Sequence, residues 1–405
     1  MMKRSGFLRT ILIASAACLL YGVSSGIRSN YGIMLGAITA SSGVDYASVS
    51  FVLAVAQLVV GLVQPLAGIL ALKKSNAFVL CAGAVLITAG LAGIPFCHSL
   101  PALLLFLGIF LAGGTGAIAF GIIMGAITPV LGERTAAMIS GFVSASCGLG
   151  GTVLAPLMQV LMNAFGFRTM MLALCVPAVL LIPISLWLSR AGTAASKATK
   201  ELSLSAMLKS AVIDRNFLRI ALAFFTCGFY MAIIETHLFS QYTSYGFSKT
   251  LVAFAFSVYG AGAMLGCVLT GFLDTVLDPK WVLGCTYGLR VPIILALLLL
   301  PKSPAFVYGT ALLFGLSGNA TVPPTSGLLT KLFGAKKLAA LFGIAFLAHQ
   351  VGSFFSSWLG GVCAAATGSY AAVWYVSMAF SAAAAILCFG VRASGHQGEE
   401  EEKIY

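Results

Sequence analysis

Residues 113–141 read GGTGAIAFGIIMGAITPVLGERTAAMISG, and residues 315–343, which begin 202 positions later, read GLSGNATVPPTSGLLTKLFGAKKLAALFG. The two stretches share five glycines at this offset, and Arg134 and Lys336 place a basic residue soon after the fourth of them. A repeat with so long a period predicts two similar halves rather than a solenoid. The coinciding residues are Gly113/Gly315, Gly116/Gly318, Gly125/Gly327, Thr128/Thr330, Gly132/Gly334, Gly141/Gly343, Gly150/Gly352 and Gly166/Gly368.

The composition indicates that this repeat lies in a membrane. Hydrophobic residues make up 60% of the 405 positions and charged residues only 8%, whereas a soluble globular protein has about 25% charged residues. The mean hydropathy is +1.03. So few charges cannot cover a surface that faces water. We therefore predict a polytopic membrane protein, and two-fold repeats in such proteins are typical of transporters.

Twelve apolar stretches are long enough to span a bilayer, for which a helix needs about 20 residues. We therefore predict an all-α integral membrane fold of twelve transmembrane helices in two pseudo-symmetric six-helix bundles. The predicted spans are 9–37, 46–71, 76–97, 101–129, 135–163, 169–189, 216–240, 250–273, 281–300, 304–330, 338–364 and 370–391. The N-terminal basic residues are typical of a signal peptide, but the apolar run after them is too long for one that is cleaved.

The basic residues predict the orientation of these spans. Of the 23 Lys and Arg residues, 18 fall in the connections on one side, three (Arg168, Lys249 and Lys302) on the other, and two (Arg28 and Arg290) within spans. By the positive-inside rule both termini are predicted to be cytoplasmic. We expect a monomer in the inner membrane, with the lipid bilayer as its surroundings.

The repeat also predicts the division of the chain. We expect an N-terminal bundle over residues 1–190, a cytoplasmic linker over 191–215, a C-terminal bundle over 216–392 and a disordered acidic tail over 393–405. A second, weaker match supports the repeat at an offset of 209, where Cys18 and Tyr21 correspond to Cys227 and Tyr230.

Several classes of function find no support in the sequence. The net charge of +12 follows the membrane topology and forms no basic stripe with interleaved aromatic residues, so no nucleic-acid partner is expected. The ten cysteines show no metal-ligand spacing, and neither a metal nor another cofactor is expected. No phosphate-binding loop is present to use a nucleotide. We do not expect an enzyme, because no nucleophile, base or metal set is clustered.

The chain resembles the major facilitator superfamily over essentially its whole length, and within it the branch of monocarboxylate porters and oxalate/formate exchangers. The motifs that carry the resemblance are RSNYG at 28–32, QPLAG at 64–68, YGLR at 287–290, the Pro323–Pro324 pair and FLAHQVG at 346–352. The resemblance implies that helices 1, 4, 7 and 10 line a central cavity.

The chain departs from family patterns in three places. The first cytoplasmic loop lacks the usual acidic residue after Gly68, whereas Asp274 is kept after Gly271 in the second half. The helix-8 arginine of monocarboxylate porters is missing, since residues 260–272 contain none. The glycine-rich helix 5 does not fit the motif of drug antiporters.

Five ionisable residues lie within the predicted spans, where a charge costs about 2.5–3.5 kcal/mol. Arg28 is suited to bind a carboxylate through its planar fork, or else forms a structural ion pair with an acid of helix 7. At the offset of 209, Glu235 corresponds to Gly26 and His237 to Arg28. We therefore expect Arg28, Glu235 and His237 at similar depth, where Glu235 and His237 act in proton coupling or as a gate, or are solvated and inert.

The remaining candidates are open to a binding and a structural interpretation. Arg290 on helix 9 either reaches the cavity or bonds helix carbonyls freed by nearby prolines. His349 on helix 11 either bonds a carbonyl or acts on protons or substrate. Hydrogen-bonding cavity residues are predicted at Tyr31, Gln57, Tyr230 and Asn319.

We predict a secondary active transporter for a small organic anion, a monocarboxylate, that works by alternating access with proton symport. The embedded charge, two arginines against one glutamate, attracts carboxylates. Anion exchange needs no titratable group and stays open as an alternative, as does efflux of drugs or sugars by the same fold.

Overall fold

A computed structural model describes residues 4–190 and 213–392, and all of its regular secondary structure within those ranges is helical. The predicted linker 191–215 and tail 393–405 fall largely outside the described residues. The first half of the chain forms α1 (Arg4–Ser29), α2 (Tyr31–Ser42), α3 (Tyr46–Lys73), α4 (Asn76–Gly93), a 3-10 turn η1 (Ile94–Phe96), α5 (Leu100–Leu103), a π-helix η2 (Leu104–Leu111), α6 (Ala112–Ala117), α7 (Phe120–Leu131) and α8 (Glu133–Arg190).

The second half follows the same order. It consists of α10 (Arg215–Ile233), a π-helix η3 (Ile234–Leu238), α11 (Phe239–Ser244), α12 (Lys249–Val276), α13 (Pro279–Leu299), α14 (Pro304–Gly318), a 3-10 turn η4 (Asn319–Thr321), α15 (Val322–Phe333), α16 (Ala335–Thr367) and α17 (Ala371–Phe389). Side chains cap several helix starts by accepting a backbone N–H, which satisfies a donor that the helix leaves free. These caps are Asp45, Ser75, Asp214, Ser248, Asp278 and Ser303.

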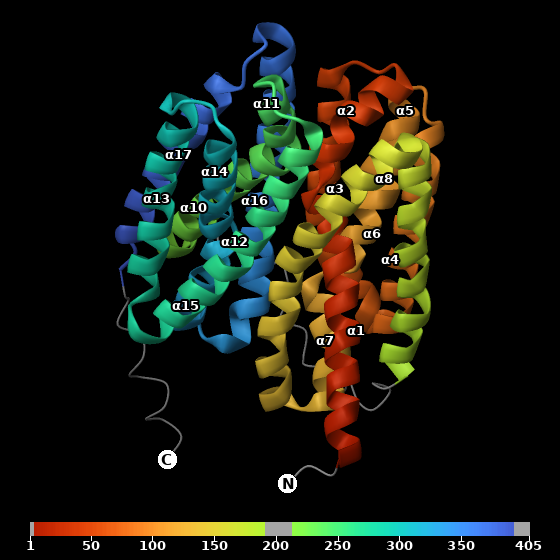
Figure 1. Ribbon diagram of the computed structural model, residues 1–405. Helices are drawn as coiled ribbons and strands as arrows, with labels where there is room; N and C mark the ends of the chain where they lie inside the picture. The colour runs from red at the N-terminus through yellow and green to blue at the C-terminus, as the bar shows by residue number, and fades with distance from the viewer. Residues whose placement is uncertain (1–3, 191–212, 393–405) are drawn as a thin grey trace, which may run out of the picture.

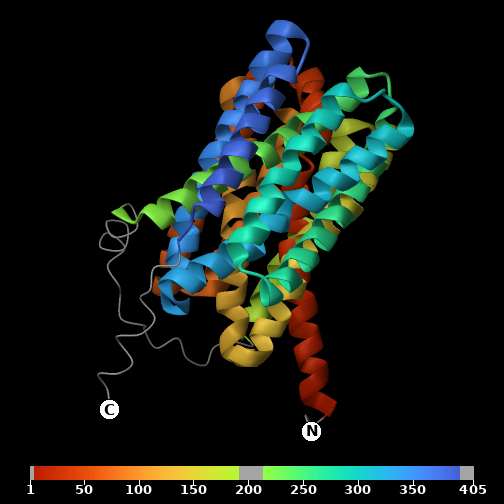
Figure 2. The same ribbon diagram turned by 90° about the vertical axis from the view of Figure 1, so that its left-hand side faces the viewer.

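The helices gather into two bundles that lie side by side (Figure 1). Helices α1–α8 form one bundle and α10–α17 form the other. The starts of α1 and α10 and the ends of α8 and α17 lie at one end of the molecule, called here the terminal end. Figure 2 shows that α1 extends beyond the other helices at that end. The α2–α3, α11–α12 and α16–α17 connections lie at the opposite end.

The predicted all-α membrane fold is confirmed. Ten helical stretches in the described part of the chain are long and apolar enough to cross a membrane. One of them, Met138–Leu188, has 51 residues, and Gly166 divides it with a φ of 80°, outside helical values. The 33-residue α16 adds a further helix of membrane length. With the stretch Met138–Leu188 counted as two helices and with α16 added, the described residues contain twelve helices of membrane length.

The repeat found in the sequence is also a repeat of backbone conformation. Gly132 (φ 75°) and Gly334 (φ 82°) both adopt a positive φ between two helices, which side chains with a Cβ rarely adopt. Gly166 (φ 80°) and Gly368 (φ 67°) form a second such pair. The break between α6 and α7 at residues 118–119 corresponds to η4 at 319–321. All these features recur at the offset of 202.

The offset of 209 for helices 1 and 7 is wrong. A Cβ on Gly150 would overlap the carbonyl oxygen of Gly22, and a Cβ on Gly352 would overlap that of Phe225. These equivalent contacts relate α1 to α10 by 203 positions, close to the offset of the other helices. A match of one cysteine and one tyrosine was too short to fix the register. At 203, Glu235 corresponds to Gly32 rather than to Gly26.

Candidate functional site

The two bundles meet between the middle of the molecule and the end opposite the termini. Here α3 packs on α16 and α8 on α12. The Ser257 hydroxyl donates to the Thr152 carbonyl (2.8 Å) and the Gln350 amide to the Gln57 carbonyl (2.8 Å). Toward the terminal end, no atom of another segment lies within 4 Å of a Cβ built on Gly68 of α3 or on Gly343 of α16. In the described part of the chain, these contacts join the bundles along a zone called here the seam, and the two glycine positions toward the terminal end lie outside it.

Arg28 lies at the end of α1, and its Nη1 is 3.7 Å from Oε2 of Glu235 across the seam. The same Nη1 donates to Gln57 Oε1 at 3.0 Å. The Glu235 side chain is 4% exposed and that of Arg28 is 15% exposed. Among the described residues, Nε and Nη2 of Arg28 have no hydrogen-bond partner. The site therefore holds a guanidinium that is neutralised by one acid but has two nitrogens available for another.

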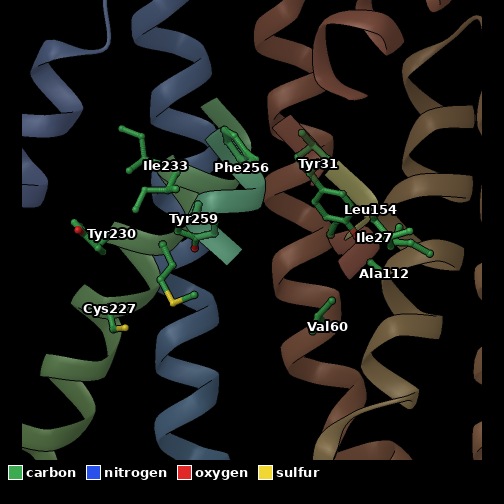
Figure 3. Close-up of a cluster of buried hydrophobic side chains, with 14 of the residues drawn as sticks. Ile27, Tyr31, Val60, Ala112, Leu154, Cys227, Tyr230, Ile233, Phe256 and Tyr259 are labelled. Atoms are coloured by element: carbon green, nitrogen blue, oxygen red, sulfur yellow. The ribbon is translucent and has the colours of Figure 1, made fainter. Parts of the chain in front are cut away.

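Further polar atoms around this pair lack partners. Within the described chain, Gln57 Nε2 and the hydroxyls of Tyr31 and Tyr259 are buried and form no hydrogen bond. Tyr31 follows Arg28 by three positions, so the two lie on neighbouring turns. Figure 3 shows Tyr31 on one side of the seam and Tyr259 on the other. Tyr259 lies within electrostatic range of both Glu235 and Arg28. The amide of Gln57 and the two hydroxyls therefore add hydrogen-bond donors beside the available nitrogens of the Arg28 guanidinium.

His237 belongs to a second network at the seam, nearer the end opposite the termini. Its Nε2 lies 2.7 Å from the Ser357 carbonyl, and its Nδ1 lies 3.0 Å from the Tyr46 hydroxyl. The carbonyl can only accept, so Nε2 carries a hydrogen and Nδ1 of the neutral ring accepts from Tyr46. The Tyr46 oxygen in turn lies 2.8 Å from the Tyr370 hydroxyl. His237 is fully buried, so it is part of the packed seam and is not solvated.

Arg290 lies away from the seam, inside the second bundle. Its Nη2 donates to the carbonyls of Ser317 (2.8 Å) and Gly318 (3.0 Å), and its Nε donates to Ser317 (3.2 Å). Its guanidinium carbon lies 4.3 Å from the ring centroid of Tyr230. The 3-10 turn η4, just before Pro323, leaves these carbonyls free at the end of α14. These contacts match the interpretation in which Arg290 bonds helix carbonyls, and not the one in which it reaches the cavity.

The other predicted residues are also held by neighbours. The Tyr230 hydroxyl is 2.8 Å from Ser317 Oγ. His349 Nδ1 donates to Gln350 Oε1 at 3.0 Å, and its ring stacks on that of Phe346. Asn319 begins η4 and is half-buried. Of the predicted site residues, the structure thus brings Arg28, Tyr31, Gln57 and Glu235 together, with His237 at the same seam.

The sequence analysis missed Tyr46, Tyr259 and Tyr370. Each tyrosine lies in or beside an apolar stretch where an aromatic residue is ordinary packing material. Tyr259 precedes Gly260, whose Cβ position would lie 2.7 Å from the Gly148 carbonyl oxygen. That close approach of α12 and α8 is what carries Tyr259 to the seam. Gly260 is the local feature of the sequence that indicates a close crossing of helices. It does not indicate which polar residues Tyr259 approaches across the seam.

Comparisons with known proteins agree with this architecture. The model of the Major Facilitator Superfamily matches residues 17–275 and 239–403. Monocarboxylate transporter 13 of Bos taurus is 24% identical over 358 residues, which cover 88% of this chain and 83% of that protein. Monocarboxylate transporter 11 of Mus musculus is 25% identical over 396 residues, covering 94% and 87%.

Two further relatives are informative. An uncharacterized MFS-type transporter, YcxA of Bacillus subtilis, is 29% identical over 168 residues, covering 40% of this chain and 41% of that protein. The crystal structure of a D-xylose-proton symporter superposes with a TM-score of 0.74 at 15% identity, over 95% of this chain and 98% of that one. At that identity the likeness concerns the fold alone. Two six-helix bundles joined by a seam, and a family model that matches nearly the whole chain, lead to one conclusion: the protein belongs to the Major Facilitator Superfamily and is a transporter, not an enzyme.

Proposed function

We propose that the protein moves a small organic anion, a monocarboxylate, across the membrane by alternating access. The observation that carries the proposal is Arg28 at the seam, which has one acidic partner and, within the described part of the chain, two guanidinium nitrogens without partners. A guanidinium forms two parallel hydrogen bonds with a carboxylate. The similarity to monocarboxylate transporters 11 and 13 supports the same class of substrate.

Glu235 and the substrate compete for Arg28 in this proposal. With the site empty, Glu235 neutralises the buried guanidinium. A substrate carboxylate takes over Arg28, and Glu235, left in an apolar surrounding, binds a proton because an unpaired buried charge is costly. The proton and the anion then cross together, as in symport. In this proposal the rest of a small polar substrate bonds to the Gln57 amide and to the Tyr31 and Tyr259 hydroxyls, and their lack of hydrogen-bond partners among the described residues supports this role.

The seam acts as the gate. We propose that the terminal end faces the cytoplasm, as the basic residues predict, so that the described state is closed to the outside. Opening to the outside must separate Arg28 from Glu235 and Tyr46 from His237. Both contacts join the two bundles, and their loss is compensated when water or substrate takes their place.

An uptake assay tests the substrate class. Purified protein in liposomes, with an inward proton gradient, is expected to accumulate labelled lactate, pyruvate, formate or oxalate. The expected result is uptake of at least one carboxylate that an excess of the same unlabelled anion inhibits. Extrusion of lipophilic drugs or uptake of sugars, without uptake of any carboxylate, would contradict the proposal and favour efflux or sugar transport by this fold.

Glu235→Gln separates symport from exchange. Glutamine keeps the shape and the polarity of the side chain but cannot bind a proton, so uptake driven by a pH gradient is expected to fall about tenfold or more. Exchange of labelled for unlabelled anion should persist, because it needs no net proton movement. Gradient-driven uptake that survives the substitution would show that Glu235 does not carry the proton.

A further inference from the structure

The charge of Arg290 has no acidic partner among residues 4–190 and 213–392, which the structure describes. Among the described residues the ion pairs with carboxylates are Arg28–Glu235 and Lys331–Asp278. Arg290 is fully buried, and its Nη1 forms no hydrogen bond within the described chain. Carbonyl oxygens and aromatic rings carry partial negative charge, but none of them carries a full one. A buried cation of this kind normally has an anionic partner.

The Cys227 sulfur is the atom beside Arg290 that can become an anion. Arg290 Nη2 lies 3.3 Å from Cys227 Sγ. Thr321 Oγ1 lies 3.0 Å from the same sulfur, whereas its alternative acceptor, the Gly318 carbonyl, is 3.5 Å away. A thiol hydrogen on Cys227 would have the Thr321 oxygen or the Gly318 carbonyl, at 3.9 Å, as its acceptor, whereas a thiolate would accept from both Arg290 and Thr321. Arg290 thus donates to the sulfur, and the Thr321 hydroxyl is placed to donate to it as well.

We infer that Cys227 is held as a thiolate, ion-paired with Arg290, and is the reactive cysteine of this transporter toward uncharged, membrane-permeant electrophiles. The thiolate accepts hydrogen bonds from Arg290 and from Thr321. It supplies the charge that the guanidinium otherwise lacks, at the point where helix α14 ends in η4. The pair ties α10, which carries Cys227, to α13 and to this break.

The other groups that face the sulfur are compatible with this assignment. His349 of α16 lies within electrostatic range of Cys227 and is uncharged or positive. Tyr230 of α10, Tyr287 of α13 and Cys388 of α17 are neutral hydroxyl or thiol groups in the same interior. None of them adds a negative charge that would oppose the thiolate. A thiolate, not a thiol, is the form that reacts with electrophiles.

The dependence of the alkylation rate on pH tests the inference. A full-length variant that keeps only Cys227 among the ten cysteines, checked for folding by size exclusion, is treated with N-ethylmaleimide between pH 6 and 7.5. A thiolate reacts at a rate that changes less than about twofold over this range. A protonated thiol reacts about tenfold faster for each pH unit, because the thiolate fraction rises tenfold. A matched variant that keeps only Cys388, also buried, is expected to show that steep rise.

Two substitutions then test the role of the partners. Thr321→Val removes one donor and is expected to make the profile of Cys227 steeper, and Arg290→Lys should retain the flat profile. Arg290→Met can unfold the protein, so it is not used in this test. The decisive measurement is the pH profile of the variant that keeps only Cys227, with Arg290 and Thr321 unchanged. A rate that rises tenfold per pH unit there would overturn the inference, as would the same profile for Cys227 and Cys388. Neither outcome depends on which substrate the protein carries.

Discussion

The two arginines within the membrane spans differ in what they contact. Arg28 is at the seam, bonds only side chains and keeps two nitrogens available. Arg290 is inside one bundle, where it bonds the carbonyls of Ser317 and Gly318 and lies against aromatic rings. The first arrangement can change partners while the halves move, and the second cannot. A charge within a membrane span therefore indicates function only when its contacts can be exchanged.

Arg290→Met should have the largest effect. It leaves the Ser317 and Gly318 carbonyls buried without a donor, and each such group costs about 1–3 kcal/mol. We expect a loss of stability of about 3 kcal/mol or more, measured as the thermal midpoint in detergent. Arg28→Gln is the matched control and should lose less, because the hydrogen bond and the ion pair of Arg28 are to side chains and its removal leaves no buried helix carbonyl of the described chain without a donor. A larger loss of stability in Arg28→Gln than in Arg290→Met would contradict this comparison.

The two bundles can be compared through their equivalent glycines. Gly150→Ala and Gly352→Ala each place a methyl group on a backbone carbonyl of the neighbouring helix. Both should lose about 1–3 kcal/mol or more through overpacking. Gly141→Ala and Gly343→Ala are the controls, since a Cβ there meets no atom of another segment within 4 Å, and these should remain within about 1 kcal/mol. Similar losses in all four variants would contradict the packing described here.

Arg28→Lys tests whether Arg28, unlike Arg290, binds the substrate carboxylate. Lysine keeps the charge but loses the planar fork, so the carboxylate loses a charge-assisted hydrogen bond of about 1.5–3 kcal/mol. We expect kcat/KM for carboxylate uptake to fall about 10- to 100-fold, with an unchanged melting temperature. Unchanged uptake would remove Arg28 from the substrate site.

The smallest effect is expected at the terminal end, where Lys331 Nζ lies 2.8 Å from Asp278 Oδ2. Burial alone would raise the pKa of Asp278, but hydrogen bonds from Lys331 and from the Lys280 amide outweigh it and hold the pKa below its ordinary value. The stabilisation is therefore present above about pH 4 and is lost as the pH falls through the lowered pKa. Lys331→Met should cost less than about 1 kcal/mol at pH 7.

That loss should also depend on pH. Thermal melting of the two proteins at pH 7 and at pH 3 measures it, and the difference between them should shrink at the lower pH. A difference that grows at low pH would contradict the sign of the shift.

Much of the fold follows from the sequence because its signals are local. Apolar length predicts the spans, and Gly132 and Gly334 mark the same turn in both halves because their backbone conformation requires glycine. The contact of Arg28 with Glu235 was expected, although the register used to argue it was six positions off. The pair was found because ionisable residues within spans are few.

Other parts of the site could not be predicted. The bond from Tyr46 to His237 joins residues 191 positions apart, and only the crossing of α3 with the second bundle brings them together. The contact of Cys227 with Arg290 joins residues 63 positions apart, and nothing near either residue in the sequence indicates it. These contacts depend on which face each helix turns toward its neighbour. That face cannot be predicted from an apolar stretch that has no amphipathic pattern.

The wide turn η3 (Ile234–Leu238) carries both Glu235 and His237. A π-turn contains one residue more than the α-helical path it replaces, and each residue of an α-helix turns the chain by about 100°. Rewinding this single segment to α geometry would therefore swing the acid and the imidazole away from α1 and α3 without tilting α10. A local change over these five residues would then release both of their seam contacts, whereas the α3–α16 and α8–α12 contacts would still have to part by movement of the bundles.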